Sequence, residues 1–433
     1  MNERRILELD RRHVWHPYTQ MSAYAQGTEP LLVARASGSR LYDARGRSYI
    51  DANSSWWCAS LGHDHPRLKA ALYEQMELAP HVSLAGITHE PAALLAEALA
   101  ERAPRGLERV FYSDNGSTAI EAALKLCLQY WYQNGAPERR RFVALHSAFH
   151  GETLGATALG GVPVFRRPFA SVVLDCVHVP LESGGAERAF SALERLLESE
   201  AGSIAGVVLE PVVQAAGGMR FYDSTLLRAA RELTRRHDVF LVVDEVFTGF
   251  GRTGPFWGLD HAGIEPDLLC VAKGLSGGLL PFAATLANQR IFEGFLGGAE
   301  RTFFYGHTFA GNPLGARVAL EVLRVYDEER IVDAAQAKAR AIARAFTKLG
   351  GMPGVTGARA LGMIGALELP GSEGYLGTLG KVVYDHALSL GAYLRPLGDT
   401  IYVAPPINIS DEDLAELLEI VGQAVSYALE HRC

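Results

Sequence analysis

Short, continuous runs of apolar residues recur through the middle of the chain, separated by longer stretches in which apolar residues have helical spacing. Such uniformly apolar runs are typical of parallel strands that are covered on both faces. The predicted strands are Arg109–Ser113, Arg141–Leu145, Gly206–Glu210, Phe240–Asp244, Leu268–Ala272 and Phe282–Ala287. Their alternation with helices predicts an α/β fold in which helices wrap a mainly parallel sheet.

The helical pattern is plainest in two stretches, one after Ser117 and one from Leu226, which are rich in Ala, Leu and Arg and carry an apolar stripe. The chain ends instead mix helix and strand patterns, with strand candidates at Met363–Leu369 and Ile401–Ala404. We expect both ends to meet as one smaller α+β domain. The expected parts are an N-terminal segment of the small domain, the large domain and a C-terminal segment of the small domain: residues 1–60, 61–324 and 325–433.

Composition narrows the classes of partner. The 433-residue chain has a formal net charge of −8, a pI near 6.0 and no dense block of Lys and Arg, which argues against nucleic acid or an anionic membrane as a partner. The N-terminal sequence is charged and lacks an apolar core of signal-peptide length, and no run reaches the ~20 apolar residues that cross a bilayer. We therefore expect a cytoplasmic protein that acts on small molecules.

The five cysteines are scattered and show no Cys-x-x-Cys spacing. Neither a disulfide framework nor a metal site is predicted from such a pattern. We expect all five to be reduced packing residues: Cys58, Cys127, Cys176, Cys270 and Cys433.

Candidate chemistry lies at the ends of two predicted strands. The run FLVVD ends on Asp244, and the run LLCVA is followed by Lys273 and a glycine-rich turn. Ligands of open α/β sheets bind at this carboxyl edge. A carboxylate there needs a cationic partner, and a lysine beside apolar groups loses proton affinity and becomes a usable nucleophile. Taken singly, Asp244 could equally form an ordinary ion pair and Lys273 could extend into water.

A third feature is the segment SDNGSTAIEAALK, which places Gly116 and Ser117 between a strand and a helix. Backbone N–H groups and hydroxyls at a helix N-terminus bind phosphate, although Gly and Ser also cap helices without any ligand. Together, Lys273, Asp244 and this segment supply what pyridoxal 5′-phosphate requires: imine attachment, an anion under the pyridine nitrogen and a phosphate anchor.

Four segments, DEVFTGFGRTG, AKGLSGG, LEPVVQAAGG and GHTFAGNPLG, resemble in order and separation the class III (omega) aminotransferases of fold type I. The resemblance covers essentially the whole chain and implies a homodimer with two active sites at the subunit interface. It implies that Lys273 is the Schiff-base lysine and proton shuttle and that Asp244 is the pyridinium partner. The other cofactor-binding residues that it implies are Gly116, Ser117, Phe149 and Val246, with Thr308 reaching the phosphate of the partner subunit.

Two further segments, HVWHPYTQM and DANSSWWCASLGHDHP, resemble the branch of this family that forms 7,8-diaminononanoate from 8-amino-7-oxononanoate in biotin synthesis, with S-adenosylmethionine as amino donor. We expect Trp56 and Trp57 on an amphipathic strand, where one indole would point outward to line a cavity or a subunit contact. The substrate-binding residues that the resemblance implies are Tyr18, Trp56, Trp57, Glu210, Arg252, Gly306, Arg395 and Tyr402.

Some of these residues have simpler explanations. Glu210 could be an ordinary acid at a strand end, Arg252 could be purely structural, and Arg395 could be a surface arginine that binds a nearby loop.

Three positions depart from the pattern common in this enzyme group. Phe149 stands where many members have Tyr, Glu152 replaces a common Asp, and His307 replaces the Pro of Gly-Pro-Thr. The departures leave open a different amino donor, such as lysine, or a broad omega-amino acid or diamine:pyruvate aminotransferase. Decarboxylation, racemisation and amino-group migration also stay open, because side chains choose which bond the shared cofactor breaks.

Overall fold

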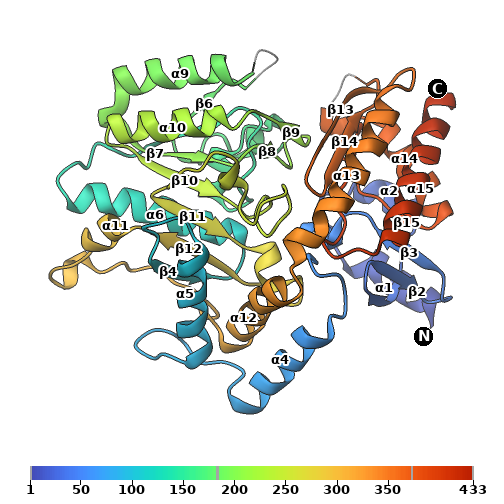
Figure 1. Ribbon diagram of the computed structural model, residues 1–433, viewed down its shortest axis with the longest axis horizontal. Helices are drawn as coiled ribbons and strands as arrows, with labels where there is room; N and C mark the ends of the chain where they lie inside the picture. The colour runs from blue at the N-terminus through green and yellow to red at the C-terminus, as the bar shows by residue number, and fades with distance from the viewer. Residues whose placement is uncertain (1, 182–184, 372–373, 432–433) are drawn as a thin grey trace.

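A seven-stranded sheet forms the centre of the computed structural model, which describes residues 2–181, 185–371 and 374–431 (Figure 1). The strands lie in the order β4 (Arg109–Ser113), β12 (Ala283–Ala287), β11 (Leu268–Val271), β10 (Phe240–Asp244), β7 (Ile204–Leu209), β5 (Arg141–Leu145) and β6 (Cys176–Val179). β12 is antiparallel to both of its neighbours, and the remaining pairs are parallel. The predicted fold class, with a mainly parallel sheet, is confirmed. Sequence analysis missed β6, a short edge strand that contains a histidine.

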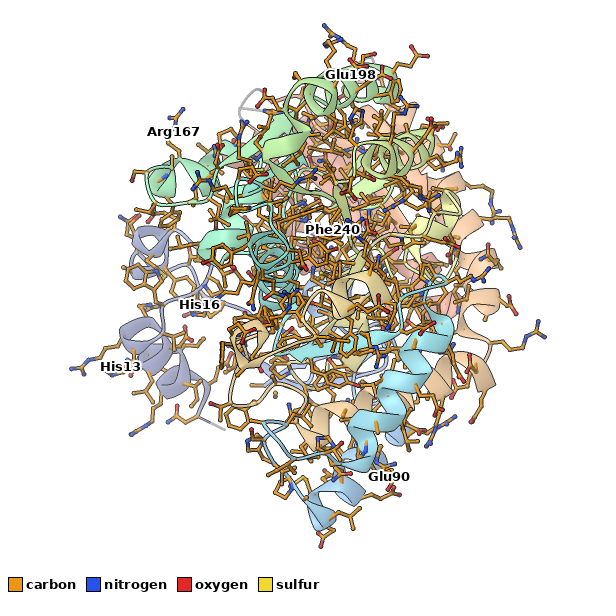
Figure 2. All side chains as sticks on the ribbon, turned by 90° about the vertical axis from the view of Figure 1, so that its left-hand side faces the viewer. His13, His16, Glu90, Arg167, Glu198 and Phe240 are labelled. Carbon is orange, nitrogen blue, oxygen red and sulfur yellow. The ribbon has the colours of Figure 1, made fainter. Side chains whose placement is uncertain are left out.

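Both faces of the sheet are covered by helices. Along β10, Phe240 and Val242 belong to the apolar cluster of helix α6, whereas Leu241 and Val243 belong to the cluster of α9 and α10; Figure 2 places Phe240 deep inside the molecule. This alternation follows the two-residue period of a strand. The helices between residues 60 and 330 are α4 (Pro66–Leu78), α5 (Glu90–Arg102), α6 (Gly116–Gln133), α7 (Leu154–Leu159), α8 (Pro163–Arg166), α9 (Gly185–Glu200), α10 (Thr225–Arg236), α11 (Gln289–Glu293) and α12 (Pro313–Glu328).

The two chain ends share a second region, and both termini lie on the same side of the molecule (Figure 1). One sheet has the order β1 (Val33–Ser37), β2 (Arg40–Asp43), β3 (Ser48–Asp51) and β15 (Ala392–Tyr393), and another has the order β13 (Thr356–Leu361), β14 (Ile364–Glu368) and β16 (Thr400–Val403). The helices are α1 (Glu3–His13), α2 (Met21–Ala25), α13 (Ile331–Gly350), α14 (Leu379–Leu390) and α15 (Asp411–Glu430). The domain boundaries at residues 60 and 324 stay a prediction.

The tryptophan pair does not lie on a strand, as the sequence analysis expected. Trp56 and Trp57 belong to the short turn α3 (Ser54–Trp57), in which all four residues have left-handed φ angles of 48°, 45°, 63° and 74°. L-residues disfavour this conformation, so local sequence preference could not have indicated it. Contacts from distant parts of the chain override the strand-like pattern.

Two smaller observations bear on earlier expectations. Within the described residues, no helix combines the length and apolar character that crossing a membrane requires. Four cysteines are free; Cys127, Cys176 and Cys270 are buried, whereas Cys58 is partly exposed. Cys433 lies outside the described residues.

Adjacent carboxylates at the end of β10 have different surroundings. Asp244 lies in the cavity described below, whereas the fully buried Glu245 binds the turn that begins at Gly258. Its carboxylate accepts hydrogen bonds from the Thr248 hydroxyl at 2.6 Å, the Gly258 N–H at 2.9 Å and the Leu259 N–H at 2.7 Å. Burial raises the pKa of Glu245 to about 7, although these hydrogen bonds oppose the shift. Glu245 is therefore a structural carboxylate.

We predict that Glu245→Gln lowers the free energy of unfolding by about 1–3 kcal/mol at pH 5, because the Gln amide group leaves at least one buried donor without an acceptor. Between the ordinary Glu pKa and about 7, the folded state binds more protons at Glu245 than the unfolded state does, so wild-type stability falls as pH rises through this window. The difference between wild type and variant should therefore shrink from pH 5 to pH 8. Urea unfolding at pH 5 and pH 8 measures the free energy of unfolding of both proteins, with a substitution at an exposed position, Glu265→Gln, as control. If the difference between wild type and Glu245→Gln is the same at both pH values, the raised pKa of Glu245 is contradicted.

Candidate active site

A cavity of about 1260 Å³ lies at the carboxyl edge of the central sheet, large enough for a cofactor together with a substrate. Most of the residues singled out from the sequence line it. These are Tyr18, Trp56, Trp57, Gly116, Ser117, Phe149, Glu210, Asp244, Val246, Lys273 and Arg395. Four others do not line it within the described chain: Arg252, Gly306, Thr308 and Tyr402.

Asp244 is held at the bottom of the cavity by two contacts. Its Oδ2 lies 2.7 Å from Nδ1 of His150, and its Oδ1 accepts the Val246 N–H at 3.0 Å. Burial alone would lower the pKa of His150, but the hydrogen bond to Asp244 and the charge of Asp244 outweigh it, so the pKa of His150 lies above its ordinary value. His150 is thus the side chain that hydrogen-bonds Asp244 within the protein, and sequence reasoning missed it.

Lys273 follows β11 and extends toward the same region. Its ammonium nitrogen lies 4.6 Å from the centre of the Trp57 ring and 5.9 Å from that of Phe247. This enclosure lowers the pKa of Lys273, although the charges of Asp244 and Glu210 oppose the shift. A lysine with reduced proton affinity is better able to act as a nucleophile and to exchange protons.

The N-terminus of α6 packs closely against the loop after β5. The Ser117 hydroxyl accepts the N–H groups of Glu152 and Thr153, both at 3.0 Å. A Cβ atom at Gly151 would lie 2.3 Å from Ser117 Oγ, and one at Gly116 would lie 2.6 Å from Val246 Cγ1. Only glycine fits these two positions, which keeps the helix terminus close to Val246 and the cavity open above it.

Glu210 connects two loops beside the cavity. Its carboxylate accepts the N–H groups of Phe149 and Ala215, both at 3.0 Å, so it fixes the backbone that carries Phe149. Burial raises the pKa of Glu210 to about 7, while the nearby His150 opposes the shift. Its contacts within the described chain are thus those of a residue that orders loops.

An aromatic wall forms the opposite side of the cavity. Tyr18 packs edge-on against Trp56 and Phe165, with ring centres 5.3 Å and 5.4 Å apart. The Arg395 guanidinium lies over the Trp56 ring, 3.7 Å from its centre. The Tyr18 hydroxyl donates a hydrogen bond to Glu152, and burial together with this bond raises the pKa of Tyr18. An apolar wall therefore carries one fixed cation and one fixed anion.

Arg252 and Tyr402 lie behind the wall rather than in it. The buried Arg252 donates to the Pro405 carbonyl at 2.7 Å and contacts Ser54 Oγ at 3.4 Å, and burial lowers its pKa to about 10. The Tyr402 hydroxyl accepts the Trp57 indole N–H at 3.1 Å. The hydrogen bonds of Arg252 and Tyr402 thus go to the backbone at Pro405, to Ser54 and to Trp57, and a contact of either residue with substrate stays a prediction.

The loop with Gly306 and Thr308 lies at the surface, and both residues are exposed. His307 between them places Nδ1 2.7 Å from Oδ2 of Asp114, which precedes the α6 terminus. This pairing gives the His307 departure a local physical role.

Phe165, Phe247 and Tyr375 also line the cavity, and the sequence analysis did not single them out. Phe165 lies between Phe149 and Tyr375, with ring centres 5.9 Å and 4.7 Å away. Phe165 and Tyr375 lie in none of the quoted segments, whereas Phe247 lies in DEVFTGFGRTG. His150, in contrast, could have been found, because it directly follows Phe149 at the same predicted strand end.

The residues present fit pyridoxal 5′-phosphate. His150 Nε2 and Asp114 Oδ1 are buried at the cavity without a partner among the described residues, as expected of a site that a polar ligand completes. Lys273 and Asp244 are placed for attachment and for the pyridine nitrogen. The α6 terminus offers N–H groups for a phosphate.

Comparison with known proteins agrees with this geometry. Residues 22–425 match the aminotransferase class-III family. A protein from Geobacter sulfurreducens named adenosylmethionine-8-amino-7-oxononanoate aminotransferase is 38% identical, with 97% of each chain covered. A protein of the same name from Synechococcus elongatus is 39% identical over 95% of this chain and 97% of its own.

Solved structures include adenosylmethionine-8-amino-7-oxononanoate aminotransferase from Methanocaldococcus jannaschii, with a TM-score of 0.94, 31% identity and coverage of 98% of this chain and 99% of that chain. The omega transaminase from Pseudomonas jessenii in complex with PMP has a TM-score of 0.92 and 29% identity, with 98% of each chain covered. Both kinds of enzyme thus share the fold.

We predict that Asp244→Asn keeps the shape of the site but lowers kcat by about 10³, because a neutral amide would no longer stabilise positive charge on the ring nitrogen of a bound cofactor. Single-turnover kinetics with cofactor content measured by absorbance checks this. Asp223→Asn, at an exposed site remote from the cavity, serves as control. An Asp244→Asn rate within a few-fold of wild type would show that the charge is not required.

Proposed function

The chain belongs to the class III aminotransferase family and is a pyridoxal 5′-phosphate-dependent enzyme, and we propose that it transfers an amino group from S-adenosylmethionine to 8-amino-7-oxononanoate, forming 7,8-diaminononanoate in biotin synthesis. The observation that carries the choice of substrate is the aromatic wall with Arg395 stacked on Trp56. Relatives that share nearly the full length bear the name of this activity. A cytoplasmic location, expected from the N-terminal sequence, is part of the same proposal.

The acceptor is a long methylene chain that ends in a carboxylate. Tyr18, Trp56 and Phe165 present apolar faces to such a chain, and burying methylene groups there favours binding by about 0.8 kcal/mol each. Arg395 can pair with the carboxylate through two parallel hydrogen bonds. A small acceptor such as pyruvate would leave most of this wall unused.

The donor differs from the acceptor in carrying a positive charge that the cavity has to accommodate. The sulfonium of S-adenosylmethionine is a cation that aromatic faces attract, and Glu152 adds a negative charge beside Tyr18. One cavity serves both substrates in turn, since donor and acceptor bind successively in a ping-pong cycle.

When bound, pyridoxal 5′-phosphate supplies the carbonyl that takes up the amino group and the ring that accepts electrons when a substrate carbon loses its proton. The protein residues hold and move the protons. Lys273, with its lowered pKa, carries the proton at Nζ. Asp244 holds a negative charge under the ring nitrogen and is itself oriented by His150. Gly116 and Ser117 would hold the phosphate, and Phe149 and Val246 would pack against the ring.

A second candidate is a broad omega-amino acid or diamine:pyruvate aminotransferase. Solved omega transaminases have nearly the same fold, with a TM-score of 0.92 for the Pseudomonas jessenii enzyme. The departures at Phe149, Glu152 and His307 lie in or beside the cavity, where the choice of donor could change.

A matrix of donors and acceptors separates the two candidates. S-adenosylmethionine, lysine and simple diamines are each tested with 8-amino-7-oxononanoate and with pyruvate. We predict that 7,8-diaminononanoate forms fastest with S-adenosylmethionine and that pyruvate reacts at least about tenfold more slowly, because it cannot use the wall. An inert oxononanoate together with rapid diamine:pyruvate turnover would replace the proposal with the second candidate.

The proposal includes a homodimer in which Gly306 and Thr308 act on the partner's site. Within one chain the two residues are exposed and lie outside the cavity, and Phe304 and Phe309 beside them are 81% and 59% exposed. Large apolar side chains gathered on one exposed loop favour a protein contact.

Mixed dimers test this arrangement. A Lys273→Ala chain and a Thr308→Ala chain are co-expressed with different tags, and the mixed dimer is purified. If Thr308 reaches the partner's phosphate, one site of the mixed dimer has both residues intact and should recover about half of the wild-type rate. Each parent dimer should be impaired, the Thr308→Ala dimer through an about 10–100-fold weaker affinity for the cofactor. A mixed dimer without a high-affinity cofactor site would show that Thr308 acts in its own chain.

A further inference from the structure

The left-handed turn Ser54–Trp57 carries two of the tryptophans that line the cavity, Trp56 and Trp57, and we propose that Asp51 is a positioning residue that holds this turn and thereby fixes the aromatic wall that selects the acceptor. The inference rests on the proposed function for the identity of the acceptor. Its structural basis is the set of contacts that Asp51 makes at the end of β3.

Asp51 is fully buried, and both oxygens of its carboxylate bind the turn or its neighbours. Oδ1 accepts the Asn53 N–H at 3.1 Å, and Oδ2 accepts the Ser55 N–H at 2.6 Å. His63 Nε2 also lies 2.9 Å from Oδ2. The carboxylate therefore binds two N–H groups in and just before the turn, and His63 keeps it in place.

The far side of the turn is held less extensively. The Ser54 hydroxyl donates to the Ala404 carbonyl at 2.7 Å, and the Arg252 guanidinium lies 3.4 Å from the same hydroxyl. Neither contact reaches the backbone of Ser55, and no other side chain among the described residues accepts its N–H. Asp51 is thus the side chain that holds the Ser55 N–H directly before Trp56, while the Cys58 thiol binds the Ser55 carbonyl.

The handedness matters because of where the two indoles point. On a strand, adjacent side chains lie on opposite faces, so only one of the pair could face the cavity. In a helical turn, successive side chains differ by about 100°, and both Trp56 and Trp57 line the cavity here. Trp56 lies under Arg395 and Trp57 lies beside Lys273, at 3.7 Å and 4.6 Å from the respective ring centres. Loss of the turn would remove both contacts together.

Ser55 offers a way to test the turn independently of Asp51. Its φ angle is 45°, and its side chain is exposed, so replacement sacrifices little packing. Glycine adopts this φ without the steric penalty that a Cβ atom causes, whereas alanine keeps the penalty and removes only the hydroxyl. Ser55→Gly should therefore reduce the dependence of the turn on Asp51, and Ser55→Ala should not.

The experiment compares Asp51→Ala alone and combined with each Ser55 variant, in the holoenzyme. We expect Asp51→Ala to raise KM for 8-amino-7-oxononanoate by about tenfold or more and KM for pyruvate much less, because pyruvate does not use the wall. Loss of the Trp57 contact with Lys273 should lower kcat with both acceptors alike. Its near-ultraviolet circular dichroism should lose the part of the tryptophan signal that Trp56 and Trp57 contribute, while the absorbance of bound cofactor persists. Ser55→Gly should restore the signal and most of KM, and Ser55→Ala should restore neither.

Equal behaviour of the two double variants would overturn the proposal, as would an Asp51→Ala enzyme with unchanged KM and dichroism. If Asp51→Ala does not fold, the single variants decide: Ser55→Gly should melt at a higher temperature than Ser55→Ala. The same two substitutions at Ser199, inside helix α9, should have the opposite effect, so Ser199→Ala should melt at a higher temperature than Ser199→Gly. Equal melting temperatures of the two Ser55 variants would also overturn the proposal.

The dichroism and melting measurements need no substrate, so they separate the two hypotheses. If oxononanoate is inert but Ser55→Gly still restores the signal, the proposed function fails and the role of Asp51 in holding the turn stands. KM is then measured with the acceptor that the wild-type enzyme does use.

Discussion

Asp244 is buried at the bottom of a cavity, where a carboxylate without hydrogen-bond partners would destabilise the fold by several kcal/mol. The hydrogen bond to His150 and the N–H of Val246 remove most of that cost. These partners require the loop after β5 to reach across to the end of β10. Ser117 and Glu210 make this possible, since the first binds the N–H groups of Glu152 and Thr153 and the second binds the N–H of Phe149. The same contacts therefore shape the cofactor site and pack the strand ends that carry Ser117, Glu210 and Asp244 against the loop after β5.

The sequence contained enough information for the sheet and for the bottom of the cavity. Buried parallel strands are apolar throughout, so β4, β5, β10 and β11 could be located within one residue of their observed ends. Parallel strands bring their carboxyl ends to one edge, and this rule alone predicted that Asp244, Lys273 and Ser117 would meet. The antiparallel direction of β12 could not be predicted, because strand direction leaves no trace in an apolar run.

The remaining features depend on contacts between residues far apart in the chain. The turn at Ser54–Trp57 has a strand-like sequence and a left-handed backbone, and that backbone depends on contacts with Asp51 and with the distant Ala404 and Arg252. Arg252 and Tyr402, which the resemblance places at the substrate, do not line the cavity within the described chain. Their motifs correctly indicated proximity to the site. Spacing along the sequence does not say whether a side chain points into a cavity or supports its wall.

The two charges on the wall bear on how one cavity could serve two dissimilar substrates. Arg395 lies on the face of Trp56, and Glu152 binds the hydroxyl of Tyr18, whose ring packs against the same tryptophan. Within the described residues, no salt bridge joins Arg395 to Glu152, so neither charge is neutralised by the other. An ion pair between them would have to be broken by each incoming substrate. Because aromatic groups hold the two charges apart instead, in the proposed reaction an acceptor carboxylate can pair with the arginine and a donor cation can be drawn toward the glutamate, each without rearranging the wall.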